Sequence, residues 1–139
     1  MFGRIKKSGF TLIEIMLVVI IIGALAAMVI PRFAGRSDQA KAAAAKADIE
    51  ANLATALKLY ELDNGGFPTT SQGLEALITK PTINPVPSSW NGPYIEKKPD
   101  DPWGKPYIYV SPGEHRADYD LYSKGKNASK EDDDVTNWK

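Results

Sequence analysis

An apolar run at residues 10–30 constrains this chain more than any other feature. It reads FTLIEIMLVVIIIGALAAMVI, and Glu14 is its only strongly polar residue. As an α-helix that rises about 1.5 Å per residue, the run is about 32 Å long, which matches the roughly 30 Å hydrocarbon core of a bilayer. The run therefore predicts a membrane-spanning helix, and the carboxylate inside it needs an explanation.

Two simpler kinds of segment explain the run less well. A secretory signal also starts with basic residues, here Arg4, Lys6 and Lys7, but its apolar core is usually about 7–15 residues long and ends in a small-residue cleavage site. An ordinary single-pass anchor accounts for the length and the basic flank but not for Glu14. An unpartnered carboxylate deep in an apolar span costs on the order of 2–3 kcal/mol, so such residues are usually functional.

The residues at the start of the run match a processing signature. The letters KSG end at Gly9 and are followed by FTLIE, from Phe10 to Glu14. This stretch resembles the G/F-T-L-x-E signature of type IV pilins and pseudopilins. The resemblance implies that a prepilin peptidase in the membrane cuts between Gly9 and Phe10 on the cytoplasmic side and N-methylates Phe10.

The resemblance also implies a division of the chain. Residues 1–9 become a cleaved basic leader, residues 10–30 a transmembrane helix that also forms the filament core, and residues 31–139 a periplasmic pilin-like domain that includes the second half of the helix. The chain is then expected to be a single-pass inner-membrane protein with its carboxy-terminal domain in the periplasm, and part of a periplasmic filament when assembled.

Glu14 lies one helical turn after the amine that cleavage would create at Phe10. An amine and a carboxylate are each costly in an apolar bundle, and far less so as a pair. If subunits stack with a stagger of about one turn, the carboxylate of one approaches the amine of its neighbour. Within one subunit Glu14 can also cap its own helix. The sequence leaves both arrangements open, and Phe10 and Glu14 are the predicted assembly residues of a homopolymer.

A second helical segment follows the apolar run. Residues 33–63 are dense in alanine, lysine, glutamate and leucine, which favours helix. Within 40–47, AKAAAAKA suits either close approach of other helices or a solvated spacer. Pro31 predicts a bend or a local break, because proline costs about 3 kcal/mol in a helix interior. Spacings of three and four residues predict one buried stripe, made of Ile49, Leu53, Ala56, Leu57 and Tyr60.

Beyond this helix, which glycines at residues 65–66 are expected to end, the predicted elements are short. Residues 71–78 predict a helix of about two turns. Residues 92–95 predict a short edge strand, and the β-rich runs 107–110 and 119–123 predict an antiparallel hairpin. The expected fold class is α+β, with one long amino-terminal helix packed on a small antiparallel sheet.

The motifs of this head resemble one family in particular. Five stretches follow the order found in the G-type major pseudopilins of type II secretion systems: NGGFPT (64–69), QGL (72–74), GPY (92–94), DPWGKPY (101–107) and YDLYSKG (119–125). The resemblance implies a type IV pilin-like fold and a structural subunit of a filament that drives export of folded proteins across the outer membrane. Its implied partners are further copies, minor pseudopilins, the prepilin peptidase and the inner-membrane assembly platform.

The main alternative is a type IVa pilin or another pilin-like surface filament subunit, which serves adhesion or motility. Such pilins share the amino terminus but typically close the carboxy-terminal loop with a disulfide. This chain has no cysteine, so it cannot form that bond.

The acidic run 131–134 suggests a cation site near the end of the chain. Taken alone, such a run is usually a solvated surface, but the more apolar residues 135–138 predict that the segment folds back onto the head. Calcium takes six to eight oxygens from carboxylates, carbonyls and amides, and the resemblance implies one calcium ion in a carboxy-terminal calcium-binding loop. The residues carried over are the carbonyl of Lys124 and the side chains of Asn127, Asp132 and Asp134, with Asp133 pointing away. Asn127 stands where the family usually has aspartate.

Composition disfavours other functions. The 17 basic and 17 acidic residues give a formal net charge of +0, so no overall field favours nucleic acid, and the head's aromatic residues are interleaved with few cations. The absence of cysteine excludes thiolate metal sites, and the single histidine, His115, excludes a site built on several imidazoles. No cluster of acid, base and nucleophile stands out, and we expect no enzyme.

Overall fold

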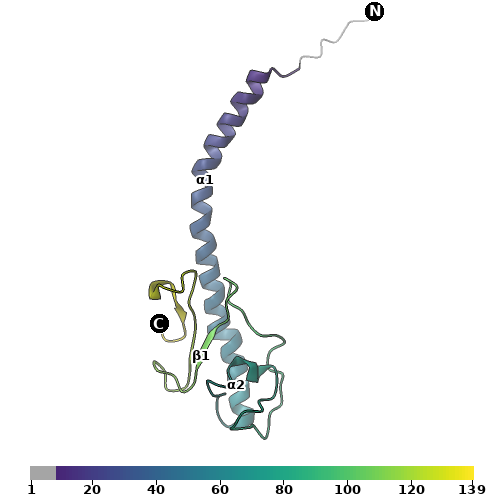
Figure 1. Ribbon diagram of the computed structural model, residues 1–139, viewed down its shortest axis with the longest axis vertical. Helices are drawn as coiled ribbons and strands as arrows, with labels where there is room; N and C mark the ends of the chain where they lie inside the picture. Colours follow the sequence, from purple (N-terminus) through teal and green to yellow (C-terminus); the bar gives the residue numbers. More distant parts are fainter. Residues whose placement is uncertain (1–8) are drawn as a thin grey trace, which may run out of the picture. The chain divides into compact units, whose positions relative to one another are not determined.

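The computed structural model describes residues 9–139, apart from the side chain of Ala34, and Figure 1 shows their elements. The chain divides into two compact units, residues 1–37 and residues 38–139, which are described separately. All of the predicted leader except Gly9 lies outside the described residues.

The first unit contains most of helix α1, which as a whole runs from Leu12 to Ala47. By length and composition, the helical stretch that starts at Leu12 is long and apolar enough to cross a membrane, and none of its most apolar part is buried. Pro31 lies inside α1, so the predicted local break there is wrong. A proline removes one backbone hydrogen bond, and the turns on either side keep theirs. The predicted bend stays a prediction.

In the second unit the helical stretch supplies one side of the hydrophobic core. The predicted stripe is confirmed: Ile49, Leu53, Ala56, Leu57 and Tyr60 are all buried, together with Ala45. They pack in one cluster with Leu74 and Leu77 and with residues of the sheet. The spacing of apolar residues was sufficient for this prediction because only one face of a helix can contact a sheet.

A single π-helical turn, η1 (Asp48–Asn52), separates α1 from α2 (Leu53–Asn64). Asp48 accepts a hydrogen bond from Asn52 Nδ2 at 2.7 Å and one from the Tyr107 hydroxyl at 3.0 Å. The predicted helix end is confirmed, because Gly65 adopts φ 79° and donates its N–H to Glu61 O at 2.7 Å. A left-handed residue after the last turn is the usual way to end a helix, and glycine enters that region without strain.

The sheet has three antiparallel strands in the order β1-β2-β3. They are β1 (Ile108–Val110), β2 (Asp120–Ser123) and β3 (Val135–Thr136). The predicted hairpin is confirmed as β1 and β2, which pair with Tyr109 opposite Leu121. The predicted return of residues 135–138 to the head is confirmed too, and β3 pairs with β2 through Tyr122 and Thr136.

Two short elements differ from the prediction. Residues 92–95 form no strand, because the N–H groups of Tyr94 and Ile95 bond to the Leu77 carbonyl instead of a neighbouring strand. The expected two-turn helix is the 3-10 helix η2 (Leu74–Leu77), which follows a turn. A second 3-10 helix, η3 (Glu131–Asp133), carries most of the acidic run.

The two faces of the sheet have different surroundings. Tyr109 and Leu121 on one face are buried in the core with the helix. Residues alternate between faces along a strand, so Asp120, Tyr122 and Thr136 share the other face. That outer face carries one of the two polar sites of the head.

Candidate functional site

Glu14 caps the amino-terminal end of α1. Its Oε2 accepts hydrogen bonds from the Thr11 N–H at 3.2 Å and the Thr11 hydroxyl at 3.3 Å, and Thr11 Oγ1 accepts one from the Glu14 N–H at 3.3 Å. A threonine and a glutamate that satisfy each other's N–H groups three residues apart form a capping box. The Thr-x-x-Glu spacing is the sequence signal for it. The sequence analysis allows a cap by Glu14 but does not identify Thr11 as its partner.

The predicted processing residues lie at the same end of the helix. Gly9 and Phe10 precede the first turn of α1, and Phe10 is 84% exposed. The bond between Gly9 and Phe10 therefore lies on an exposed stretch just before the turn that contains Glu14. How Glu14 pairs in a filament stays a prediction.

The last residue of β2 and the loop that follows it, residues 123–127, are fastened to the turn that contains Asp101. This buried carboxylate accepts the backbone N–H groups of Trp103 at 3.0 Å and Lys105 at 2.8 Å. Its other oxygen accepts the Ser123 hydroxyl, and Ser123 Oγ accepts the N–H of Gly125 at 3.0 Å. The DPWGK turn thus fixes the start of the loop that is predicted to bind calcium.

Asp133 faces the same loop from η3, so the prediction that it points away is wrong. Asp133 Oδ2 accepts the N–H of Asn127 at 3.0 Å. Gly125 has φ +61°, and a Cβ there would overlap the Asp133 carbonyl, so the close approach requires glycine. Asp133 Oδ1 is buried and has no hydrogen-bond partner among the described residues. A run of four acids gives no signal for which member turns inward.

The other predicted ligands are placed differently. Lys124 and Asn127 belong to this loop, and Asp132 is exposed. Asp134 lines a cavity that includes no residue of 124–127. Within residues 9–139, no three histidine or acidic side chains are grouped closely enough to hold a metal ion by themselves, so any ion at the loop would also need carbonyl and amide oxygens.

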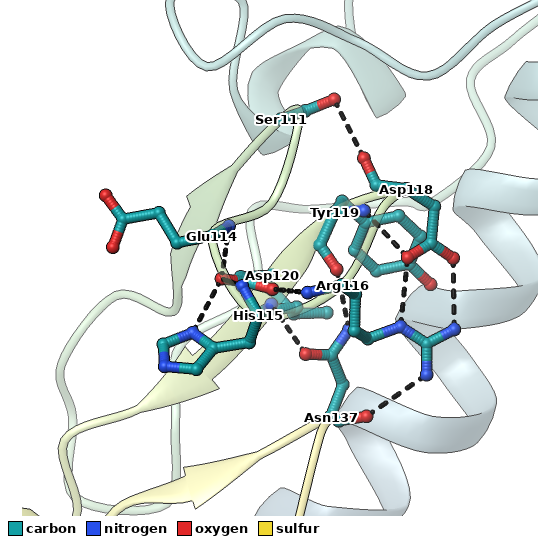
Figure 2. A network of polar contacts seen from close by, with 9 residues as sticks. Ser111, Glu114, His115, Arg116, Asp118, Tyr119, Asp120 and Asn137 are labelled. Atoms are coloured by element: carbon teal, nitrogen blue, oxygen red, sulfur yellow. Dashed lines mark hydrogen bonds and ion pairs between the residues drawn. The ribbon is translucent and has the colours of Figure 1, made fainter.

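The second polar site is a cavity of about 380 Å³ over the outer face of the sheet. Figure 2 shows the hydrogen-bond network at its edge. Carboxylates reach it from three separate elements: Asp120 from β2, Glu114 from the loop before β2, and Glu131 and Asp134 from the acidic run. Its remaining lining residues are Val110, His115, Tyr122, Thr136, Trp138 and Lys139.

Asp120 holds this network together. It is 2% exposed, and it accepts the backbone N–H groups of Glu114, His115 and Arg116 at 2.8, 2.9 and 3.0 Å as well as the His115 ring Nδ1 at 2.9 Å (Figure 2). Burial acts to raise the pKa of Asp120, but these hydrogen bonds act against it and prevail, so the pKa lies below its ordinary value.

Trp138 closes one side of the cavity. Its ring stacks on His115 with centroids 4.1 Å apart and an interplanar angle of 3°, and it meets Tyr122 edge-on at 5.3 Å. Asn137 fixes the same segment, because its side chain bonds to the Leu121 N–H at 3.1 Å and the Tyr119 carbonyl at 3.0 Å. His115 is thus held by Asp120 and Trp138, which gives the only histidine a structural role.

The fold and these sites define a class of protein. An exposed apolar helix that carries a capped acid, followed by a head with a small antiparallel sheet, is a type IV pilin-like subunit. The structure resembles a solved one, the crystal structure of the major pseudopilin from the type 2 secretion system of enterohaemorrhagic Escherichia coli, with a TM-score of 0.67 and 39% identity over 75% of this chain and 87% of that chain.

The chain belongs to the family described as type II secretion system (T2SS), protein G, whose model matches residues 32–138. Residues 4–30 match the prokaryotic N-terminal methylation motif. Two relatives named Type II secretion system core protein G are 53% identical over 97% of this chain and 97% of theirs in Pseudomonas aeruginosa, and 48% identical over 96% and 92% in Escherichia coli K12. The chain is therefore a structural pseudopilin and not an enzyme, and the type IVa pilin alternative is set aside.

Proposed function

We propose that this pseudopilin is processed between Gly9 and Phe10, waits in the inner membrane with its head in the periplasm, and polymerises through residues 10–30 into the type II secretion filament. The exposed apolar surface of α1 supports this, because a helix without a partner in its own chain must be covered by lipid or by other helices. Prepilin peptidase, minor pseudopilins and the inner-membrane assembly platform are the partners that this role requires.

The single observation that carries the assembly proposal is the capping box at Glu14. In the monomer the carboxylate satisfies Thr11 and so remains tolerable near the membrane surface. In the filament it would pair with the methylated amine of Phe10 of a neighbouring subunit, and two charges that are each costly in an apolar bundle would neutralise each other.

Substitution of Glu14 by glutamine separates these two roles. Glutamine can also accept the capping hydrogen bond, but it carries no charge for the neighbour's amine. We expect Glu14→Gln to insert and to lose its leader normally, as measured by mass spectrometry, but to form no filaments by electron microscopy. Thr11→Ala is the matched control, since it weakens the cap and keeps the charge, and it should still assemble. Normal filaments from Glu14→Gln would show that the acid serves only as a cap.

We also propose that the loop 123–127 binds calcium. The ion would be held by the carbonyl of Lys124, the amide oxygen of Asn127 and the carboxylate of Asp133. The feature that fits a cation is the buried Oδ1 of Asp133, which has no hydrogen-bond partner in the described part of the chain. Asp132 and Asp134 remain predicted ligands beside it. Bound calcium would supply positive charge that fastens the acidic run to the loop.

A calcium titration tests this second proposal. We expect calcium to raise the melting temperature of the full chain in detergent and to protect residues 123–138 from proteolysis, because an ion that binds only the folded state stabilises it by mass action. Magnesium at the same concentration is the control, since it fits an irregular cage of carbonyl oxygens poorly. No change in either measurement would exclude a calcium site.

A further inference from the structure

The cavity over the outer face of the sheet has the features of a binding site. Besides its acids it contains Thr136, which is 2% exposed and whose Oγ1 has no hydrogen-bond partner among the described residues. Thr136 lies opposite Tyr122 on β2, so the two side chains lie on the face that lines the cavity. A buried hydroxyl without a hydrogen-bond partner is uncommon. The Thr136 hydroxyl belongs to a cavity that is also lined by carboxylates, which accept hydrogen bonds.

The cavity favours a positively charged ligand. Four carboxylates line it, those of Glu114, Asp120, Glu131 and Asp134, whereas Lys139 is the one lysine or arginine among its lining residues in the described part of the chain. Glu114 and Asp134 come from different elements, and within the part of the chain that the structure describes the acids are too dispersed for one metal ion. Spread carboxylates next to the rings of Tyr122 and Trp138 suit the ammonium or guanidinium group of a long side chain, which can also lie against an aromatic face.

The same head presents a matching pair of cations. Lys97 and Lys98 are adjacent and exposed, and neither forms an ion pair with a residue in the described range. They border a separate hollow of about 360 Å³, whose lining also includes Asp48 and Asn52 of η1.

The cavity and the lysine pair lie on opposite sides of the helical stretch. Lys46 donates hydrogen bonds to the carbonyls of Thr136 at 3.1 Å and Lys139 at 2.9 Å, so it marks the side of the cavity. Asp48, two residues further along, lies on the side of the lysine pair, and residues two apart in a helix point in nearly opposite directions. Figure 1 shows the yellow carboxy-terminal segment on one side of the helix and the green segment that leads into β1 reaching the other.

We propose that the outer cavity receives Lys97 or Lys98 of a second copy of this chain. Two complementary patches on opposite sides of one subunit make a head-to-tail contact, which repeats without closing and so generates a filament. The inference rests on the proposed polymerisation and adds a contact between heads to the one between apolar helices. Opposite charges across the contact would fix the register of neighbouring heads.

Cysteine crosslinking in assembled filaments tests this contact, and the chain contributes no cysteine of its own. The double variant Glu131→Cys/Lys98→Cys places thiols on the exposed rim of the cavity and on the lysine pair. Under mild oxidation it should give a ladder of dimers and higher multimers on non-reducing gels. Glu131→Cys/Lys80→Cys, which moves the second thiol to another exposed lysine, is the matched control and should give none.

A charge exchange gives an independent measurement. Lys98→Glu should reduce filament yield, and the combination Lys98→Glu/Glu131→Lys should restore much of it. Filaments that form normally but give no Glu131→Cys/Lys98→Cys ladder would overturn the head contact and leave the proposed function standing. Failure of the parent chain to form filaments would overturn the proposed function and this inference with it.

Discussion

Asp120 and Asp133 are two carboxylates of the same head, and they differ in how many hydrogen bonds their oxygens accept. Asp120 accepts hydrogen bonds from three backbone N–H groups and a histidine ring nitrogen. Its charge is therefore stabilised by groups of the fold itself. Asp133 accepts one N–H, and its buried Oδ1 has no hydrogen-bond partner within residues 9–139. A saturated buried carboxylate holds structure, whereas a half-saturated one can bind something further. The following experiments test that difference.

The largest effect is expected from Asp120→Asn. An amide cannot accept all of the hydrogen bonds that converge on Asp120, and its NH₂ group would face backbone donors, so the free energy of unfolding should fall by about 3 kcal/mol. Denaturant unfolding of the full chain in detergent measures this loss, which should be equal in calcium and in chelator. A loss that appears only in calcium would contradict the structural role.

Asp133→Asn should have the reverse dependence on calcium. In chelator its melting temperature should stay near that of the parent, while the calcium-induced rise should disappear, a loss of about 2.7 kcal/mol at a calcium concentration 100 times the dissociation constant. The comparison variant is Asp132→Asn, on the neighbouring predicted ligand, which should lose less of the rise because its side chain is exposed. If the two variants respond alike, the free oxygen of Asp133 has no special role.

Removal of the Trp138 ring should have an intermediate effect. Trp138→Ala loses the stack on His115 and the edge contact with Tyr122, and we expect a decrease of about 2 kcal/mol in the free energy of unfolding. Trp138→Phe keeps an aromatic face and should recover part of it. Equal losses in both variants would mean that stacking contributes little.

Acidification should act on Asp120. Because its folded-state pKa lies below the ordinary value, Asp120 contributes stability above its unfolded pKa of about 3.9, and that stability is lost as pH falls from there through the lower folded pKa. The melting temperature of the parent should fall in this window more steeply than that of Asp120→Asn. Parallel curves would contradict the assignment.

The smallest effect, and one of opposite sign, is expected at Asp134. Its pKa is raised by burial and by the neighbouring acids, so its ionised form destabilises the folded head at neutral pH. In chelator, Asp134→Asn should therefore raise the free energy of unfolding, by less than about 0.5 kcal/mol. A clear decrease would show that Asp134 already has a partner within the chain.

The sequence predicted most of the fold because its signals are periodic. The buried face of the helix follows from the spacing of Ile49, Leu53 and Tyr60, and the hairpin follows from two β-rich runs. Strand β3 is not predicted from the sequence, because two residues are too few to show an alternating pattern and their partner on β2 is distant in the sequence. The π-helical turn η1 is not predicted either, since helix propensity does not distinguish a π-helix from an α-helix.

The sites were harder to predict than the fold. Phe10 and Glu14 follow from a motif, and the capping role of Glu14 could have been read from Thr11 three residues earlier. Within the acidic run, the sequence analysis predicts that Asp133 points away and that Asp134 binds calcium, whereas in the structure Asp133 faces the loop and Asp134 lines the outer cavity. Adjacent side chains in a tight turn diverge, and only the surrounding contacts decide which one faces inward.

The capping box has a consequence for the supply of subunits. A carboxylate that is already engaged by Thr11 and its own backbone lowers the penalty of storing single subunits in the lipid. Polymerisation would then exchange one modest bond for a stronger one, and disassembly would reverse the exchange. Under the proposed function, such a protein would keep a reservoir of single subunits that is long-lived yet ready for assembly.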